Sequence, residues 1–325
     1  MSWKQVLEDV PETCTPGDHT TFFFAYSNDF TAQLVSDAAS VISTFFTFAD
    51  SYYPQYKKFT RLANLRFDTR QPDDIDFHDN VAPFIASINS HLPSPVLGFL
   101  NSSRTGSDVI AGIQKFLTGS PLCGSTVLLL VKRDSDLQDV SNVVDKLRAH
   151  KVFVNVIESG QTSGGASSDP LYKISTGSNG FFVFNSDKNI GESVNQLMSY
   201  FLGYNLLYAA DVKVIGNGSV SLPQVYIPLY KSSVTVNAGV SVQNHPLTDS
   251  FHNFTLTLRS RYNDRQMFYN GNVDSGTADF SSFGMYSADT WNVTLDYDYA
   301  KNTTGVAQIR LYTDERVDNY PPYSN

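Results

Sequence analysis

The stretch T-T-F-F-F-A-Y-S-N-D, at residues 20–29, is the strongest indication of the fold in this sequence. It begins as a continuous apolar run, too short to cross a membrane, and ends in a polar corner. A run of this kind predicts a strand that is buried on both faces, as in a parallel sheet covered by helices. In such sheets ligands bind outside the carboxyl ends of the strands, where the strand order reverses. A ligand is therefore expected at the corner formed by residues 25–29.

The segments that follow alternate between helical and strand patterns up to about residue 208. Apolar residues recur at helical spacing in residues 30–48, 81–88, 107–117, 139–150 and 190–207. Between these segments lie the strand-like runs R-L-A-N-L-R-F-D, S-T-V-L-L-L-V, K-V-F-V-N-V-I and G-F-F-V-F. Strands that alternate with helices predict a doubly wound, mostly parallel α/β sheet over residues 20–208. Residues 1–19, which contain two prolines, are expected to form an irregular lead-in.

The pattern changes after residue 208. Helical spacing disappears, and six short segments alternate apolar and polar residues, as in W-N-V-T-L-D-Y-D-Y at residues 291–299. Turn signals such as Asn270-Gly271 separate these segments. Both features predict an all-β antiparallel sandwich over residues 209–325. No linker separates the two patterns, so we expect the domains to touch.

Composition narrows the classes of partner. The 325 residues are 41% hydrophobic and 17% charged, which is typical of a globular protein. The net charge of −9 argues against nucleic acid and anionic lipid, because both bind basic surfaces. No apolar run reaches the roughly 18 residues that span a bilayer, so we expect no membrane insertion. The scattered histidines, and the lack of P-loop or G-x-S-x-G motifs, predict a protein that is not an enzyme and needs no cofactor.

In the order of its elements, the segment from Thr20 to Leu207 resembles a von Willebrand factor A domain, of the divergent kind found in secreted proteins beside lectin-type modules. In that family a divalent cation lies at the switch point of the sheet. It is held by an Asp-x-Ser-x-Ser corner, a Thr in a second loop and an Asp after the fourth strand. The corner of this chain aligns as A-Y-S-N-D at residues 25–29, and Thr105 in the loop S-R-T-G-S-D takes the Thr position. The Asp after L-L-L-V becomes Lys132.

These substitutions predict that the crevice has lost its metal. Mg²⁺ prefers carboxylates and other hard oxygen ligands, whereas Ala25 removes one carboxylate and Lys132 replaces another with a cation. Lys132 is expected either to stand in the place of the metal ion, bonded to the polar groups around it, or to point to solvent. Shifting the alignment by one residue would put Arg133 there instead. The predicted binding crevice consists of Ser27, Asn28, Asp29, Thr105, Asp108 and Lys132.

The two cysteines, Cys14 and Cys123, each precede a predicted buried strand by a few residues. In an A-type domain those two strands are parallel neighbours. The resemblance therefore implies a disulfide bond at the amino-terminal edge of the sheet. Two free thiols in a cytosolic protein are the alternative.

Five Asn-x-Ser/Thr sequons predict N-glycosylation at Asn101, Asn217, Asn253, Asn292 and Asn302. Asn253 and Asn292 fall on the polar phase of predicted strands, and Asn217 and Asn302 fall in turns, so the fold has room for a glycan at each. The first ten residues contain no apolar leader segment, so secretion supposes a leader upstream of Met1.

The resemblance implies a non-enzymatic extracellular protein of the binding, adhesion or host-defence type, whose A-like domain works without a metal. Its partner is expected to be an extracellular protein or a glycan. Two alternatives stay open. In one, the sandwich recognises the partner and the A-like domain is a scaffold; in the other, the A-like domain binds a metal through unusual ligands. A cytoplasmic location is the alternative to an extracellular one.

Overall fold

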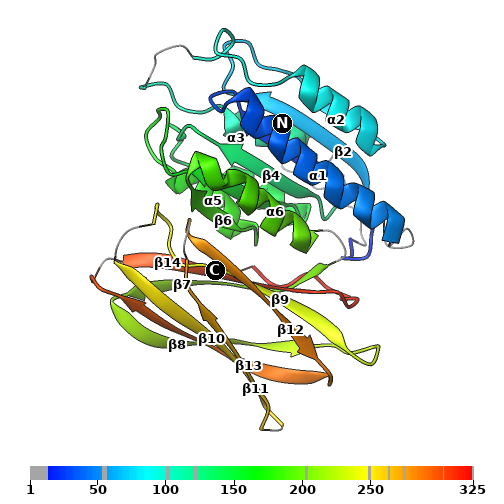
Figure 1. Ribbon diagram of the computed structural model, residues 1–325, viewed down its shortest axis with the longest axis vertical. Coiled ribbons are helices and arrows are strands. Elements are labelled where there is room, and N and C mark those ends of the chain that lie inside the picture. The colour runs from blue at the N-terminus through cyan, green and yellow to red at the C-terminus, as the bar shows by residue number, and fades with distance from the viewer. Residues whose placement is uncertain are drawn as a thin grey trace.

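The computed structural model describes residues 14–52, 57–99, 103–119, 123–201, 204–247, 250–262, 264–273, 276–302 and 304–323. These residues form an α/β domain followed by a β-sandwich (Figure 1). Residues 1–13, which make up most of the predicted lead-in, lie outside the described part of the chain.

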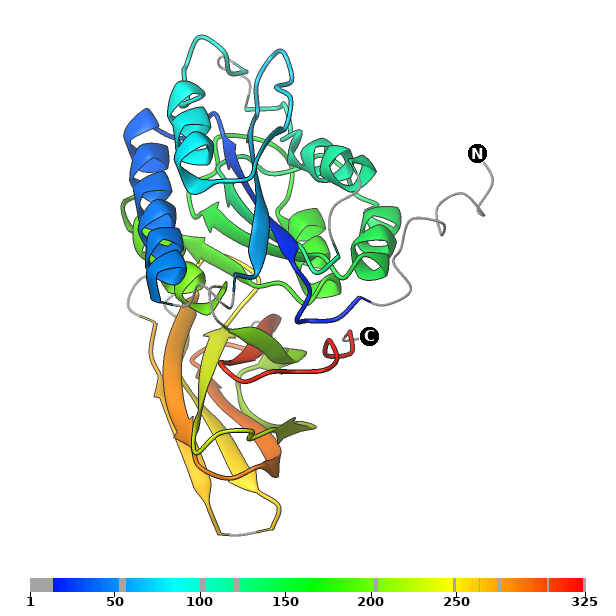
Figure 2. The same ribbon diagram turned by 90° about the vertical axis from the view of Figure 1, so that its right-hand side faces the viewer.

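The first domain is a six-stranded sheet with helices on both faces (Figure 2). Its strands are β1 (Thr20–Ser27), β2 (Phe59–Phe67), β3 (Asp76–His78), β4 (Thr126–Val131), β5 (Phe153–Ser159) and β6 (Phe182–Asn185). Its helices are α1 (Ala32–Tyr52), α2 (Val81–Ser90), α3 (Val109–Thr118), α4 (Ser141–Ala149), α5 (Asp169–Gly177) and α6 (Ile190–Phe201), with a short 3-10 turn, η3 (Asp187–Asn189), before α6.

The strand order is β3-β2-β1-β4-β5-β6, and only β3 runs antiparallel to its neighbour. This arrangement confirms the predicted doubly wound, mostly parallel α/β fold. The order reverses at β1, which lies between β2 and β4. The carboxyl ends of these three strands therefore border the crevice in which open α/β sheets bind ligands.

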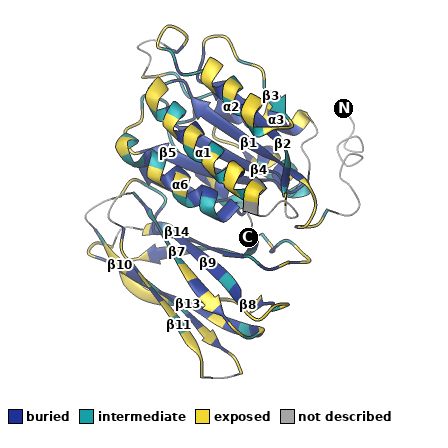
Figure 3. Cartoon of the chain, turned by 45° about the vertical axis from the view of Figure 1, so that its right-hand side comes forward, coloured by how far each residue is buried: buried dark blue, intermediate teal, exposed yellow. Residues whose placement is uncertain are grey.

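The burial of β1 on both faces explains its unbroken apolar sequence. Phe22 packs against Phe46 of α1 on one side of the sheet, with ring centroids 5.3 Å apart. Phe23 stacks on Phe116 of α3 on the other side, at 4.5 Å. Every residue of β1 is buried, whereas the helices expose one face to solvent (Figure 3). A strand covered on both sides has no polar phase, which is the pattern seen in residues 20–27.

The second domain is the predicted antiparallel sandwich of two four-stranded sheets, ordered β11-β10-β13-β8 and β12-β9-β14-β7. Its strands are β7 (Asn205–Ile215), β8 (Asn217–Ile227), β9 (Val234–Ser241), β10 (Phe251–Ser260), β11 (Gln266–Gly271), β12 (Ala278–Met285), β13 (Asp289–Tyr299) and β14 (Thr304–Thr313). The two sheets enclose one apolar core that includes Trp291, which is 2% exposed.

The sandwich begins a few residues earlier than the predicted boundary at 208/209. The last helix ends at Phe201 instead of residue 207, and β7 begins at Asn205. Leu206 and Tyr208 are buried while Leu207 between them is half-buried, which is the two-residue period of a strand. The sequence L-L-Y suits both periods, so the pattern alone did not separate helix from strand.

The sandwich covers β6, the edge strand of the first sheet. The backbone N–H of Phe182 donates to Gln308 Oε1 (2.7 Å), and that of Phe184 donates to Thr277 Oγ1 (3.0 Å). Side chains of the second domain thus satisfy donors that an uncovered edge strand would leave unpaired. The expectation that the two domains touch is confirmed.

Arg310 of β14 forms the polar centre of this domain interface. Its side chain is 0% exposed. Its Nε donates to the carbonyl oxygens of Asn179 (3.2 Å) and Gly180 (2.9 Å), and its Nη1 donates to that of Ala210 (3.0 Å). Its Nη2 forms an ion pair with Asp211 Oδ1 at 2.9 Å. One guanidinium therefore bonds to the α/β domain and to the sandwich.

Cys14 and Cys123 form the expected disulfide bond, with Cα atoms 5.9 Å apart and a sequence separation of 109. They lie before β1 and β4, which are paired parallel strands. In the described part of the chain, no helix has both the length and the apolar character needed to cross a bilayer.

Candidate functional site

The candidate site lies at the carboxyl ends of β1, β2 and β4. Ser27 ends β1, Asp68 follows β2, and Arg133 follows β4 by two residues. Backbone hydrogen bonds join the surrounding loops, since the N–H of Ser107 donates to the carbonyl of Asp134 (2.7 Å). The loops therefore form one layer over this edge of the sheet.

Arg133 lies at the centre of this crevice. Its Nε and Nη2 both donate to Asp29 Oδ2 at 2.8 Å, and its Nη1 donates to the carbonyl oxygen of Thr105 at 2.7 Å. The side chains of Arg133 and Asp29 are 4% and 14% exposed, so the ion pair is shielded from water. The guanidinium carbon also lies 5.6 Å from the ring centroid of Phe99, and Ser163 Oγ donates a further hydrogen bond to Asp29. Arg133 thus joins the β1 corner to the loop that contains Thr105.

Lys132 points to another part of the domain. Its Nζ forms an ion pair with Asp187 Oδ2 at 2.6 Å and donates to Ser159 Oγ at 3.1 Å. The two predictions for Lys132, that it stands in for the metal ion or points to solvent, are therefore wrong. The one-residue shift that places Arg133 in the crevice is the alignment that the structure supports. Successive side chains of an extended chain point to opposite sides, so a one-residue shift exchanges these two cations.

Asp68 is a site residue that the sequence interpretation missed. It is completely buried and has a left-handed backbone, with φ of 63°. Its Oδ2 accepts the hydroxyl of Ser27 (2.5 Å), and its Oδ1 accepts that of Ser107 (2.7 Å). Its own N–H donates to Asp108 Oδ1 at 2.7 Å. The signal was an Asp directly after the strand R-L-A-N-L-R-F, because Asp is one of the few residue types that accept a positive φ.

Burial raises the pKa of the Asp68 carboxyl to about 7. The hydrogen bonds from Ser27 and Ser107 act in the opposite direction, and the nearby carboxylates of Asp108 and Asp29 add to the increase. Burial also raises the pKa of Asp108. Asp68 is therefore a buried acid that gains a proton near neutral pH.

We expect the free energy of unfolding to fall by about 2 to 4 kcal/mol between pH 4 and pH 7 because of Asp68. Its pKa is about 7 in the folded protein and near the ordinary value of 3.8 in the unfolded chain. Between these values the folded state holds a proton that the unfolded state has lost, so raising the pH favours unfolding. The Asp68→Asn variant accepts the same backbone and removes this titration. Urea denaturation at several pH values measures the difference.

The exposed Asp145 of α4 provides the matched control, because Asp145→Asn removes a carboxylate that is not buried. The buried carboxyl of Glu158 also has a raised pKa. Its titration accounts for any pH dependence of the unfolding free energy that remains in Asp68→Asn. If Asp68→Asn and the wild type have the same pH dependence, Asp68 does not titrate as described.

The crevice does not fit a divalent cation. Within the described residues, no group of three or more His, Cys, Asp or Glu side chains is arranged to hold a metal ion. The Asp29 carboxylate is already paired with Arg133, and the Ser27 hydroxyl donates to Asp68. An ion beside the guanidinium would be repelled by roughly 4 kcal/mol per unit charge at about 4 Å and an effective dielectric near 20.

Five of the six predicted crevice residues lie together, but most of their side chains bond within the protein. Ser27 and Asn28 are 0% and 4% exposed. Asn28 clamps a neighbouring loop, because its Nδ2 donates to the carbonyl of Ser94 (3.0 Å) and its Oδ1 accepts the N–H of Ser94 (2.9 Å). These residues therefore position the loops and do not offer their side chains to a partner.

Exposed apolar side chains lie on the loops that flank the crevice. Val96, Leu97 and Leu137 are 66%, 40% and 44% exposed. A Cβ on Gly98 would lie 3.6 Å from Asp29 Oδ1, so the first two residues are beside the crevice. Leu137 follows Asp136, whose carboxylate accepts the N–H of Gly106 at 2.7 Å. We call these three residues the aliphatic rim.

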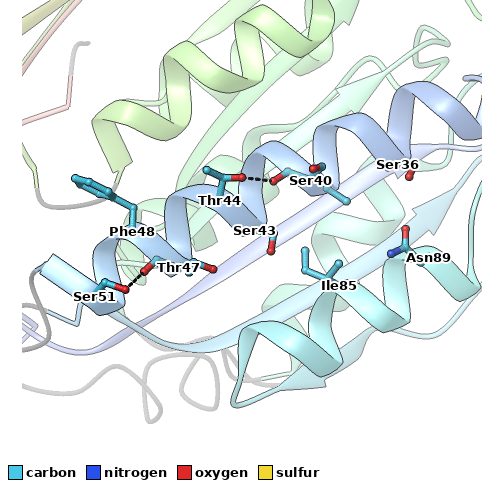
Figure 4. A pocket seen from close by; sticks show the side chains of 10 residues that line it. Ser36, Ser40, Ser43, Thr44, Thr47, Phe48, Ser51, Ile85 and Asn89 are labelled. Atoms are coloured by element: carbon cyan, nitrogen blue, oxygen red, sulfur yellow. Dashed lines mark hydrogen bonds between the residues drawn. The ribbon is translucent and has the colours of Figure 1, made fainter.

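A separate groove of about 650 Å³ lies between α1 and α2 (Figure 4). Hydroxyl side chains of α1, including Ser36 and Ser43, line it together with Asn89 of α2. Two of its hydroxyls are used by α1 itself, since Thr44 and Ser51 donate to the carbonyls four residues before them. The groove contains no charged residue among those that line it.

Four of the five predicted glycosylation sites are exposed, at Asn217, Asn253, Asn292 and Asn302. Asn101 lies outside the described residues.

Comparison with known families identifies one match, to a family described as Domain of unknown function (DUF7154), over residues 210–314. The match lies within the sandwich and covers less than half of the chain. A search of curated protein sequences found no match.

Weak similarities to solved structures accompany the A-like topology. Proximal thread matrix protein 1 from the mussel byssus is 14% identical, with a TM-score of 0.37, over 63% of this chain and 50% of that protein. A von Willebrand factor type A protein from Catenulispora acidiphila is 8% identical, with a TM-score of 0.38, over 94% and 59%. The conserved hypothetical protein BatB from Bacteroides thetaiotaomicron is 12% identical, with a TM-score of 0.35, over 55% and 97%. The chain spans only half to three fifths of the first two proteins, and its fold assignment rests on the strand order above.

Proposed function

We propose that this chain is a non-enzymatic extracellular binding protein whose A-like domain meets its partner without a divalent cation. The buried ion pair between Arg133 and Asp29 is the observation that carries the proposal. In the family that the domain resembles, a metal ion lies at this corner. Here a guanidinium joins Asp29 to the carbonyl of Thr105, so the loops are held together by a side chain.

The aliphatic rim is the contact surface that we propose for the A-like domain. Val96, Leu97 and Leu137 are exposed, whereas the polar residues inside the crevice bond to one another. Exposed aliphatic side chains gain free energy when a partner removes them from water. This chemistry favours an extracellular protein over a glycan as the partner of this face.

We propose no catalytic role for the crevice. The hydroxyl of Ser27 and the carboxyl of Asp68, 2.5 Å apart, are the pair in the crevice that most resembles a nucleophile and its base. Both residues are 0% exposed, so no substrate reaches them in this conformation. The pair is instead a structural hydrogen bond between the ends of β1 and β2.

The test is binding of the full chain to an array of purified matrix and cell-surface proteins, with divalent cations present and with a chelator. We expect binding that is unchanged by the chelator and that is lost when Leu97 and Leu137 are replaced by Asp. The matched control is Ile215→Asp, because Ile215 is an exposed aliphatic residue of the sandwich, at 51%. Binding that disappears in the chelator would contradict the proposal.

A second candidate is glycan recognition by one end of the sandwich. Tyr230, Tyr262 and Tyr286 are 68%, 73% and 71% exposed. They lie on adjacent loops. Arg265 Nη1, near Tyr262, donates to Ser287 Oγ, next to Tyr286, at 3.0 Å. Met285, which precedes Tyr286, pairs with Val234 of β9, the strand that follows Tyr230. Tyrosine rings stack on sugars as well as on apolar groups. Glycan binding that is lost in Tyr262→Ala and Tyr286→Ala, and kept in the Leu97 and Leu137 variants, would favour this candidate.

A further inference from the structure

We propose that the sheet β11-β10-β13-β8 is a face covered by N-linked glycans. The proposal rests on the extracellular location proposed above. Asn217 is the first residue of β8, Asn253 lies in β10, Asn292 lies in β13, and Asn302 lies between β13 and β14. All four are exposed, and each belongs to an Asn-x-Ser/Thr sequon.

The strand register places two of these residues in one row on the same face. Asp298 of β13 pairs with Asn217 of β8 on one side and with Asn253 of β10 on the other. Directly paired residues of a sheet point to the same face, and two strand spacings separate the outer pair by about 10 Å. Asn302 lies beside the start of this row, since a Cβ on Gly216 would be 2.6 Å from its Oδ1. Three sequons therefore gather at one end of the sheet.

Asn292 lies near the other end of the same face. Its side-chain oxygen accepts a hydrogen bond from Gln224 Nε2 at 2.7 Å, and its paired neighbour on β10 is Arg259. Tyr226 of β8 pairs with Thr290, which lies two residues before Asn292. One strand spacing and two residues place Tyr226 roughly 8 Å from Asn292. The first sugars of a glycan on Asn292 would reach this ring.

Two exposed aromatic rings on this polar face support the proposal independently. Tyr226 and Phe268 are each 59% exposed, and they lie on the two edge strands of the sheet. Large exposed rings on both edges of a sheet are a liability, because edge strands pair with other chains. Sugars that cover these rings would remove apolar surface from water and block edge pairing at the same time.

The outer face of the opposite sheet of the sandwich has no room for glycans. Its outer face packs on the A-like domain, where the ring of Phe280 lies 5.0 Å from that of Tyr200 and 5.4 Å from that of Phe181. Figure 1 shows β14 and β7 next to the A-like domain, with β8, β13 and β11 on the far side. Asn217, Asn253 and Asn292 thus lie on the sheet that is away from the domain interface.

The modification is a group transfer to the side-chain amide of each Asn. The amide nitrogen forms a bond to the anomeric carbon of an oligosaccharide carried on a lipid diphosphate. The bond from that carbon to the diphosphate oxygen breaks, the lipid diphosphate leaves with the electron pair, and the nitrogen loses one proton. The hydroxyl residues that complete the sequons are Ser219, Thr255, Thr294 and Thr304.

Peptide mass spectrometry of the protein secreted from eukaryotic cells tests the sites. An amidase that removes N-glycans converts each modified Asn to Asp, so every occupied site gains a mass label. We expect Asn217, Asn253, Asn292 and Asn302 to be occupied. Unmodified Asn253 and Asn292 in a protein with an intact Cys14–Cys123 bond would overturn the proposal and leave the extracellular location standing. If that bond and all the glycans are missing, the extracellular location fails as well.

Thiol labelling tests whether the glycans cover the sheet. Both native cysteines are in the disulfide bond, so a single introduced thiol gives the only signal. We expect a maleimide to label the Tyr226→Cys variant several-fold faster after the glycans are removed from the folded protein. Leu137→Cys on the aliphatic rim is the control, and its labelling rate should not change. Equal rates for Tyr226→Cys before and after removal would show that occupied sites leave the face open.

Discussion

The Arg133→Ala variant is expected to lose about 3 to 5 kcal/mol of unfolding free energy. The substitution removes the cation that neutralises Asp29, whose side chain is only 14% exposed. It also removes the donor to the carbonyl oxygen of Thr105. A buried carboxylate without its partner costs far more than the loss of a surface ion pair. The shift of the urea denaturation midpoint measures the effect.

A matched control separates this effect from the loss of any arginine in the region. Arg104 is an exposed residue of the neighbouring loop, and Arg104→Ala should change stability by less than about 0.5 kcal/mol. The double variant Arg133→Met/Asp29→Leu replaces the pair with apolar side chains and should recover most of the loss. If Arg133→Ala is as stable as the control, the ion pair does not hold these loops together.

The Arg310→Ala variant is expected to lose about 3 to 5 kcal/mol of unfolding free energy. We also expect its two domains to unfold independently. Its guanidinium is 0% exposed and bonds to the carbonyls of Asn179, Gly180 and Ala210 and to the carboxylate of Asp211. The substitution leaves these oxygen atoms without donors in a packed interface, and a buried acceptor without a hydrogen bond lowers stability. Calorimetry should show one unfolding transition in the wild type and two in the variant.

Arg259→Ala is the control for Arg310→Ala, because Arg259 is exposed on the far sheet of the same sandwich. Its stability and its single transition should match the wild type. A single cooperative transition in Arg310→Ala, with little loss of stability, would mean that the apolar contacts around Phe280 suffice to couple the domains.

The sequence predicted the α/β fold because its decisive features are local. An apolar run such as residues 20–27 has one stable solution, which is a strand covered on both faces. Two of the eight strands of the sandwich, β11 and β12, are not among the six segments predicted for it. For β12 the reason is the opposite one. Its outer face, with Phe280, packs on the first domain, so its apolar residues do not alternate with polar ones in the usual way. The alternation of apolar and polar residues along one strand does not reveal its contacts with another domain.

The candidate site was only partly predictable. Ser27, Asp29 and Thr105 come together because the switch point of the sheet fixes where their loops lie. The exchange of Lys132 for Arg133 depends on one residue of register, which an apolar run of four residues does not determine. Asp68 acquires its role from burial and from two hydroxyl partners on other loops, and neither is visible in the sequence.

A crystal of the full chain soaked in Mn²⁺ shows whether the crevice binds a divalent cation. The anomalous scattering of manganese reports a bound ion without any assumption about its ligands. We predict no manganese peak at the carboxyl ends of β1 and β4, with the Arg133 guanidinium within hydrogen-bonding distance of Asp29. A manganese ion coordinated by Ser27 and Asp29, with Arg133 displaced from the crevice, would show that the Arg133–Asp29 ion pair does not take the place of a metal ion.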